Sequence, residues 1–143
     1  MGAYVVTQPG SKMTFNVLIV EDQALIAMEI EDSVQSLGYH VAGVAASKAD
    51  VARVSGVPDI ALVDVNLLDG PTGPEIGKNL ALNGSTVVFM TANPELVSNG
   101  IEGAVGVMTK PVKDLDLVTV IQFAADLRAG RSATPPLALL LFA

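Results

Sequence analysis

Short apolar runs alternate along the chain with segments in which apolar residues recur every three or four positions. Short apolar runs bounded by turn residues are typical of buried strands, whereas the wider spacing indicates an amphipathic helix. Strands are therefore expected at residues 15–20, 39–45, 59–63, 85–90 and 104–108. Helices are expected at residues 23–37, 48–54, 74–82, 94–97 and 114–128.

This alternation predicts a doubly wound α/β fold. Strands that are separated by helices pair in parallel, and the helices cover both faces of the sheet. The predicted strands are apolar throughout, which fits a sheet covered on both sides, and 143 residues suffice for a single domain. We expect a five-stranded parallel sheet within residues 13–130, a flexible N-terminal extension at 1–12 and an apolar tail at 131–143.

The composition excludes several classes of function. A net charge of −7 and eight scattered basic residues argue against binding to nucleic acid, which requires clustered lysine and arginine. The absence of cysteine excludes disulfides and thiolate metal sites, and the single histidine, His40, excludes a histidine-cluster site. No apolar run approaches the roughly 18 residues that cross a bilayer, and residues 1–12 lack the pattern of a signal peptide. We therefore expect a cytoplasmic protein without a membrane segment.

Polar side chains stand at the ends of four of the five predicted strands. Glu21 and Asp22 follow the first strand, Asp64 ends the third, Thr91 follows the fourth and Lys110 follows the fifth. In a parallel α/β sheet these ends share one edge, where ligand sites form. We expect the five side chains to meet in one pocket.

Each of these residues alone has a structural alternative, such as a helix cap for Asp22 or a solvated side chain for Lys110. Together they favour phosphoryl chemistry. Three carboxylates in one pocket repel one another unless a cation joins them, and their hard oxygen atoms suit Mg²⁺. A lysine and a threonine hydroxyl can hold phosphoryl oxygens, while one carboxylate remains as a nucleophile.

Four motifs carry a resemblance to a known family: VLIVED at 17–22, ALVDVNL at 61–67, VVFMTAN at 87–93 and TKP at 109–111. The set resembles the receiver domain of two-component response regulators over residues 13–130, which implies a flavodoxin-like fold and a place in phosphorelay signal transduction. The resemblance implies that Asp64 accepts a phosphoryl group from a sensor histidine kinase or a phosphotransfer protein. The protein would thus catalyse its own phosphorylation and dephosphorylation.

The resemblance also assigns roles to the surrounding residues. Glu21, Asp22 and Asp64, with the backbone carbonyl of Asn66, would hold Mg²⁺. Lys110 would pair with the phosphoryl group, its peptide bond to Pro111 would be cis, and Thr91 would turn toward the phosphoryl oxygens in the active state.

Two positions depart from the family pattern. Val107 stands three residues before the lysine, where the family usually has a switching Tyr or Phe, and Leu68 stands where a proline is frequent. Two alternatives therefore stay open. One is a pseudo-receiver that binds without being phosphorylated. The other is an aspartyl-phosphate phosphatase of the haloacid-dehalogenase group, which would need an aspartate at the position of Asn66.

The end of the chain bears on the output of the signal. No effector domain fits in residues 131–143, so the output is expected to be a downstream protein partner, a phosphate sink or dimerisation. The last predicted helix has two apolar stripes where packing on a sheet needs one. The stripes are Leu117, Ile121 and Ala124, and Val120, Phe123 and Leu127. The second stripe and the tail would form a homodimer or partner contact, or the tail would fold back over its own helix.

Overall fold

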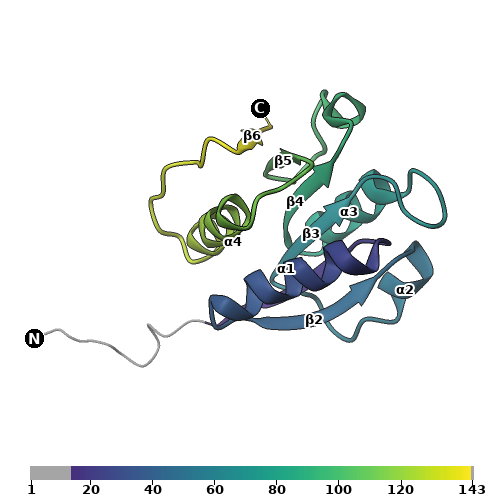
Figure 1. The fold of residues 1–143 in the computed structure, drawn as a ribbon, viewed down its shortest axis with the longest axis horizontal. Coiled ribbons are helices and arrows are strands. Elements are labelled where there is room, and N and C mark those ends of the chain that lie inside the picture. Colours follow the sequence, from purple (N-terminus) through teal and green to yellow (C-terminus); the bar gives the residue numbers. More distant parts are fainter. Residues whose placement is uncertain (1–13, 143) are drawn as a thin grey trace, which may run out of the picture.

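The computed structural model describes residues 14–142 and contains one six-stranded sheet with the order β2-β1-β3-β4-β5-β6 (Figure 1). Neighbouring strands from β1 to β5 pair in parallel, as the alternating pattern predicts. The strands are β1 (Asn16–Val20), β2 (His40–Ala45), β3 (Ile60–Asp64), β4 (Thr86–Thr91), β5 (Gly106–Thr109) and β6 (Leu139–Leu141). The helices are α1 (Ala24–Ser36), α2 (Lys48–Ala52), α3 (Gly73–Leu82), the 3₁₀-helix η2 (Pro94–Val97) and α4 (Asp114–Arg128).

Helices cover both faces of the sheet, which explains why the central strands are apolar at every position. On one face, α1 and α4 bury a core that includes Ile19, Leu62 and Met108. On the other face, α2, α3 and the segment around η2 pack over a core that includes Val63 and Phe89. The doubly wound α/β prediction is confirmed.

The predicted elements are present with bounds that differ by at most two residues, and one of them has a different form. Residues 94–97 make a single 3₁₀ turn, and the side chain of Asn93 does not cap it. Instead the backbone N–H of Asn93 donates to Thr91 Oγ1 at 3.0 Å. The connection between β4 and β5 therefore contributes little helical cover to its face of the sheet.

The C-terminal tail forms a sixth strand that the sequence pattern did not predict. From α4 the chain passes around this helix and returns to the sheet, where β6 pairs antiparallel with β5 (Figure 1). Leu139 lies opposite Met108, and Leu141 lies opposite Gly106. The tail thus folds back on its own domain, and it reaches the sheet beyond the helix.

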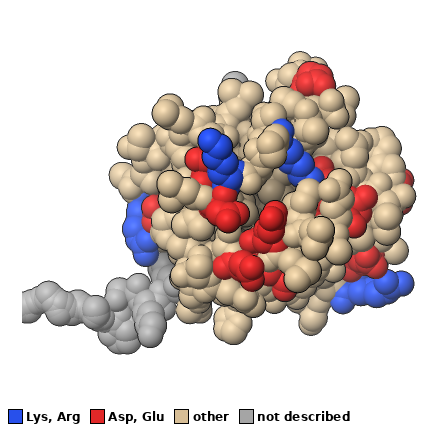
Figure 2. Space-filling view, viewed as in Figure 1, with Lys and Arg blue, Asp and Glu red and all other residues tan. Residues whose placement is uncertain are grey.

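The surface over α1 and α4 is acidic. Figure 2 shows acidic side chains gathered over the middle of the face in view, and Glu29, Asp32 and Asp114 line one hollow between these two helices. Such a surface is unsuited to a phosphate backbone. Among residues 14–142, no helix is both long enough and apolar enough to span a membrane.

Candidate functional site

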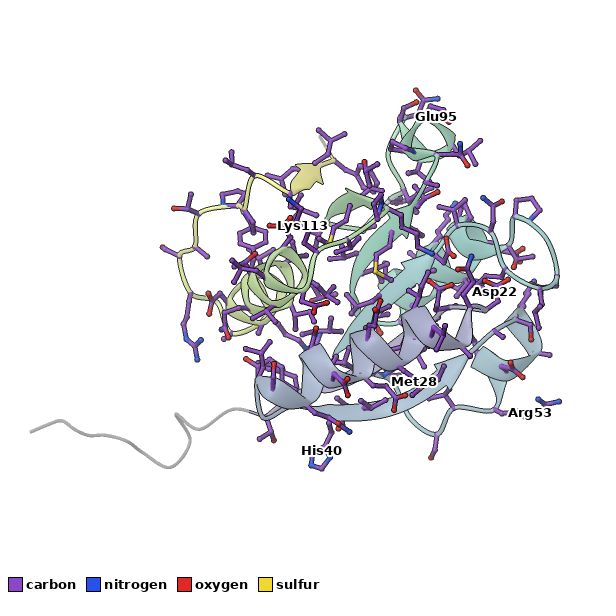
Figure 3. All side chains as sticks on the ribbon, in the orientation of Figure 1. Asp22, Met28, His40, Arg53, Glu95 and Lys113 are labelled. Carbon is purple, nitrogen blue, oxygen red and sulfur yellow. The ribbon has the colours of Figure 1, made fainter. Side chains whose placement is uncertain are left out.

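Three carboxylates converge where β1 and β3 end at the carboxyl edge of the sheet. Glu21 and Asp22 come directly after β1, and Asp64 is the last residue of β3. Figure 3 shows Asp22 at the N-terminal end of α1. Each of the three carboxylates offers one oxygen atom, and these atoms all lie within 4.8 Å of one another. Glu21 and Asp64 are buried, with only 2% and 5% of their surface exposed.

Lys110 brings a positive charge to the buried carboxylates. Its backbone N–H donates to the carbonyl oxygen of Thr91 at 2.9 Å, which places it directly beyond β5. Its ammonium donates to Glu21 Oε1 at 2.7 Å and to Asp64 Oδ2 at 2.9 Å. The peptide bond from Lys110 to Pro111 is cis, as expected from the resemblance.

The ionisation of these groups follows from burial and pairing. Burial raises the pKa of Glu21 above its ordinary value, although the hydrogen bond from Lys110 opposes part of the increase. Burial by itself would lower the pKa of Lys110, but its hydrogen bonds to Asp64 and Glu21 raise the pKa above the ordinary value of a lysine. Lys110 is therefore held as an ammonium. One ammonium faces three carboxylates, so the site retains a demand for further positive charge.

The donor set fits a hard divalent cation. Carboxylate oxygens are the ligands that Mg²⁺ prefers, and Mg²⁺ is bound through one or two carboxylates while it keeps several waters. Glu21, Asp22 and Asp64 supply such oxygens from two neighbouring strands. Asn66 is exposed two residues beyond Asp64 in the loop that leads to α3, at the same edge of the sheet.

Thr91 lies at the same edge on the neighbouring strand. It is the last residue of β4, it is fully buried, and it pairs in register with Thr109 of β5. Its hydroxyl oxygen accepts the backbone N–H of Asn93. A hydroxyl that accepts in this way still has its own proton to donate.

The backbone behind Asp64 depends on a glycine that the sequence reasoning did not single out. A Cβ atom on Gly73 would lie 2.1 Å from the carbonyl oxygen of Asp64 and 2.6 Å from the Cα atom of Val65. The N–H of Gly73 also donates to the carbonyl oxygen of Val65 at 3.0 Å. The first turn of α3 can pack this closely behind Asp64 only because Gly73 has no side chain. In the sequence, the feature that could have indicated this role is the place of Gly73 directly before the helix predicted at residues 74–82.

A second set of contacts fixes the loop between β3 and α3. Asp69 Oδ2 accepts the backbone N–H of Lys48 at 3.0 Å, and Asp69 Oδ1 accepts the Thr72 hydroxyl at 2.7 Å. These two hydrogen bonds lower the pKa of Asp69. The Lys48 ammonium also pairs with Glu75 of α3. The loop that carries Asn66 is thereby tied to the start of α2, a contact between distant segments that residue spacing could not indicate.

Comparisons with known proteins agree with this architecture. The family model described as the response regulator receiver domain matches residues 17–122. The Phyllosphere-induced regulator PhyR of Methylorubrum extorquens is 35% identical over 92 residues, which cover 62% of this chain and 34% of that protein.

Two solved structures extend the likeness. The receiver domain of the PhyR response regulator from Erythrobacter litoralis superposes with a TM-score of 0.74 at 30% identity, covering 87% of this chain and all of that chain. The anti-anti-sigma factor PhyR from Bartonella quintana gives a TM-score of 0.66 at 29% identity, covering 85% of this chain and 51% of that chain. This chain thus spans about a third of the curated PhyR and half of the Bartonella protein.

Proposed function

Because the chain belongs to the response regulator receiver domain family, we propose that it is a phosphoacceptor whose Asp64 takes a phosphoryl group from a phosphohistidine. The donor is a sensor histidine kinase or a phosphotransfer protein. The single observation that carries the proposal is the position of Asp64, buried between Lys110 at 2.9 Å and the carboxylates of Glu21 and Asp22.

The reaction is a substitution at phosphorus. A carboxylate oxygen of Asp64 attacks the phosphorus atom, the P–N bond to the donor histidine breaks, and its electron pair stays on the imidazole nitrogen. The product is an acyl phosphate. A carboxylate that is ionised needs no general base, so the work of this chain is to position the groups and to balance charge.

Glu21, Asp22 and Asp64, with the backbone carbonyl of Asn66, would hold Mg²⁺. The residual negative charge of the three carboxylates and their mutual distances support this assignment. When bound, the ion neutralises the charge that develops on the phosphoryl oxygens. The protein supplies the remaining compensation.

Lys110 and Thr91 would hold the phosphoryl oxygens. The bond that the Lys110 ammonium now gives to Asp64 passes to a phosphoryl oxygen after transfer, while its bond to Glu21 keeps it in place. Thr91 turns its hydroxyl proton toward a second oxygen. Its place at the end of β4, next to the strand of Lys110, supports this role.

A pseudo-receiver remains the second candidate because of one observation. Val107, at the usual position of the switching aromatic residue, is 2% exposed and packed in the core, where it has no ring to rotate. This departure concerns the response to phosphorylation. It leaves Asp64, Lys110 and the acidic cluster in place.

We place the output at the level of protein–protein contact in the cytoplasm. The Bartonella relative is named an anti-anti-sigma factor, and this chain spans about half of that protein. We propose that residues 13–130, with the tail at 131–143, likewise act through protein contacts. The partner would be a regulator of transcription.

The decisive experiment is the intact mass of the protein after incubation with acetyl phosphate and Mg²⁺, beside an Asp64→Asn control. We expect a gain of one phosphoryl group that requires the metal and is missing in the control. A purified histidine kinase serves as the second donor. If neither donor labels the wild-type protein, the pseudo-receiver is the better description.

A further inference from the structure

The C-terminal strand is held to the sheet by a small set of specific contacts. The backbone N–H of Phe142 donates to the carbonyl oxygen of Val105 at 3.0 Å, which extends the pairing of β6 with β5. Leu139 is buried in the same core as Met108 of β5 and Phe123 of α4. These contacts place the tail on the free edge of β5.

The edge of β5 is shaped to receive a strand very closely. A Cβ atom on Gly106 would lie 2.3 Å from the carbonyl oxygen of Leu140, so the two backbones meet at a distance that only glycine allows. On the other face of the sheet, the ring of Phe142 packs against Phe89 with centroids 6.3 Å apart and also lies against Gly100. The site therefore selects an apolar residue on one face and an aromatic residue three positions later on the other.

The same tail is only lightly attached. β6 has three residues, of which Leu140 and Leu141 are 64% and 46% exposed. An open cavity of about 610 Å³ lies between α4 and residues 132–138, so the linker does not pack tightly on the helix. Segments with few buried contacts open locally at low free energy while the rest of the fold stays intact.

The strand begins near the proposed phosphorylation site and runs away from it along β5. Leu139 pairs with Met108, two residues before Lys110, and Phe142 packs on Phe89, two residues before Thr91. In the proposed function, Lys110 and Thr91 are the residues whose hydrogen bonds change when Asp64 carries a phosphoryl group. A shift of either residue moves the end of a strand that the tail contacts.

We propose that the edge of β5 is a strand-docking site that the chain's own residues 138–142 fill in the unphosphorylated protein, and that phosphorylation of Asp64 opens it to an extended, uncharged, apolar segment of a partner protein. We expect the partner segment to resemble the tail that it replaces. Residues 132–142 carry no charge, although the net charge of the chain is −7. The inference rests on the proposed function.

The release of the tail is tested by hydrogen exchange of the Phe142 amide in the full chain. We expect this amide to exchange about tenfold faster after labelling with acetyl phosphate and Mg²⁺, while amides of β1 and β3 stay protected. The Asp64→Asn variant should show no change. If intact mass proves the adduct and the Phe142 amide remains as protected as before, the linkage is wrong although the proposed function stands. If no adduct forms with either donor, both fail together.

The docking site is tested with a fluorescent peptide that carries the sequence of residues 138–142 behind a lysine-rich solubilising tag. We expect it to bind the phosphorylated chain about tenfold more tightly than the unphosphorylated chain. The control peptide has aspartate in place of the residue that corresponds to Leu139, and it should not bind. Equal binding of the active peptide to both forms would overturn the proposal.

Two glycine variants distinguish a specific loss of strand docking from a general loss of stability. Gly106→Ala should free the Phe142 amide without phosphorylation and should abolish peptide binding. Gly43→Ala on β2 is the matched control, since its added Cβ would meet only side chains at 3.8 Å. If Gly106→Ala does not fold, Leu139→Asp provides the same release from the side-chain contact. Retention of the tail in both variants would contradict the assigned contacts.

Discussion

Replacing Lys110 with methionine removes one ammonium and leaves a side chain of similar length. In the wild-type protein this ammonium is the hydrogen-bond partner of two buried carboxylates, and the side chains of Lys110, Glu21 and Asp64 are only 14%, 0% and 8% exposed. Removing one partner of a buried ion pair leaves an uncompensated charge in a medium that solvates it poorly. Such changes cost about 3–5 kcal/mol of unfolding free energy.

The unfolding free energy that Lys110→Met loses should depend on pH, and the pKa shifts determine the direction of this dependence. Burial already raises the pKa of Glu21 above its ordinary value of 4.5, and loss of the Lys110 hydrogen bond raises it further. A group whose folded-state pKa is raised contributes stability below its unfolded pKa and loses it as the pH rises through the folded pKa. The variant should therefore be closer to the wild type at about pH 5 than at about pH 8, because the fraction of Glu21 that carries a proton, and so needs no cationic partner, increases as the pH falls.

Urea unfolding followed by far-ultraviolet circular dichroism measures the effect at both pH values. The matched control is Lys48→Met, which breaks the pair with Glu75, whose side chains are 54% and 56% exposed. An exposed pair of this kind contributes roughly 0–1 kcal/mol. The reasoning is refuted if Lys110→Met loses no more stability than Lys48→Met, or if its loss grows as the pH falls.

Three further outcomes follow from the same contacts. Mg²⁺ should raise the thermal unfolding midpoint of the wild type by mass action, and Asp22→Asn should reduce that shift, which calorimetry with and without the metal will show. Gly73→Ala should destabilise the fold by about 1–3 kcal/mol and slow labelling by acetyl phosphate, because its Cβ would meet the Asp64 backbone. Equal labelling rates for this variant and Gly43→Ala would contradict this prediction. Asp69→Asn should destabilise the protein at neutral pH. The difference from wild type should shrink as the pH falls from the ordinary aspartate value of 3.8 through the lowered pKa of the folded state, since a lowered folded-state pKa contributes stability that is lost as the pH falls.

The sequence predicts the five parallel strands and the site because both depend on local pattern. An apolar run such as Val17–Val20 indicates a strand, and the residue that follows it must lie at the edge where all the parallel strands end. The meeting of Asp64 with Lys110, 46 positions apart, needs only this rule. This prediction uses no distances, because the parallel topology alone brings the two residues to the same edge of the sheet.

The missed features depend on contacts between segments that no local pattern connects. β6 is a three-residue strand reached without a crossover helix, and its close approach to β5 is possible only because Gly106 has no Cβ atom. The roles of Gly73 and Asp69 likewise exist only relative to distant backbone atoms. The sequence does not indicate which carbonyl oxygen a given glycine approaches in the folded protein.

The tail covers a part of the sheet that the short β4–β5 connection leaves uncovered, and the side chains that it buries limit how strongly it is held. Because η2 has only four residues, the sheet face around Phe89 lacks part of its cover, and the half-buried ring of Phe142 supplies it. Burying side chains such as Leu139 and Phe142 is worth about 1.5–3 kcal/mol each when complete, and ordering the linker offsets part of that gain. A net holding energy of roughly 3 kcal/mol would weaken a competing strand about 150-fold, and phosphorylation need change it by only about 1.4 kcal/mol to alter partner binding tenfold. A lightly held strand of this kind is therefore sensitive to small movements of Lys110 and Thr91 without any rotating aromatic residue at Val107.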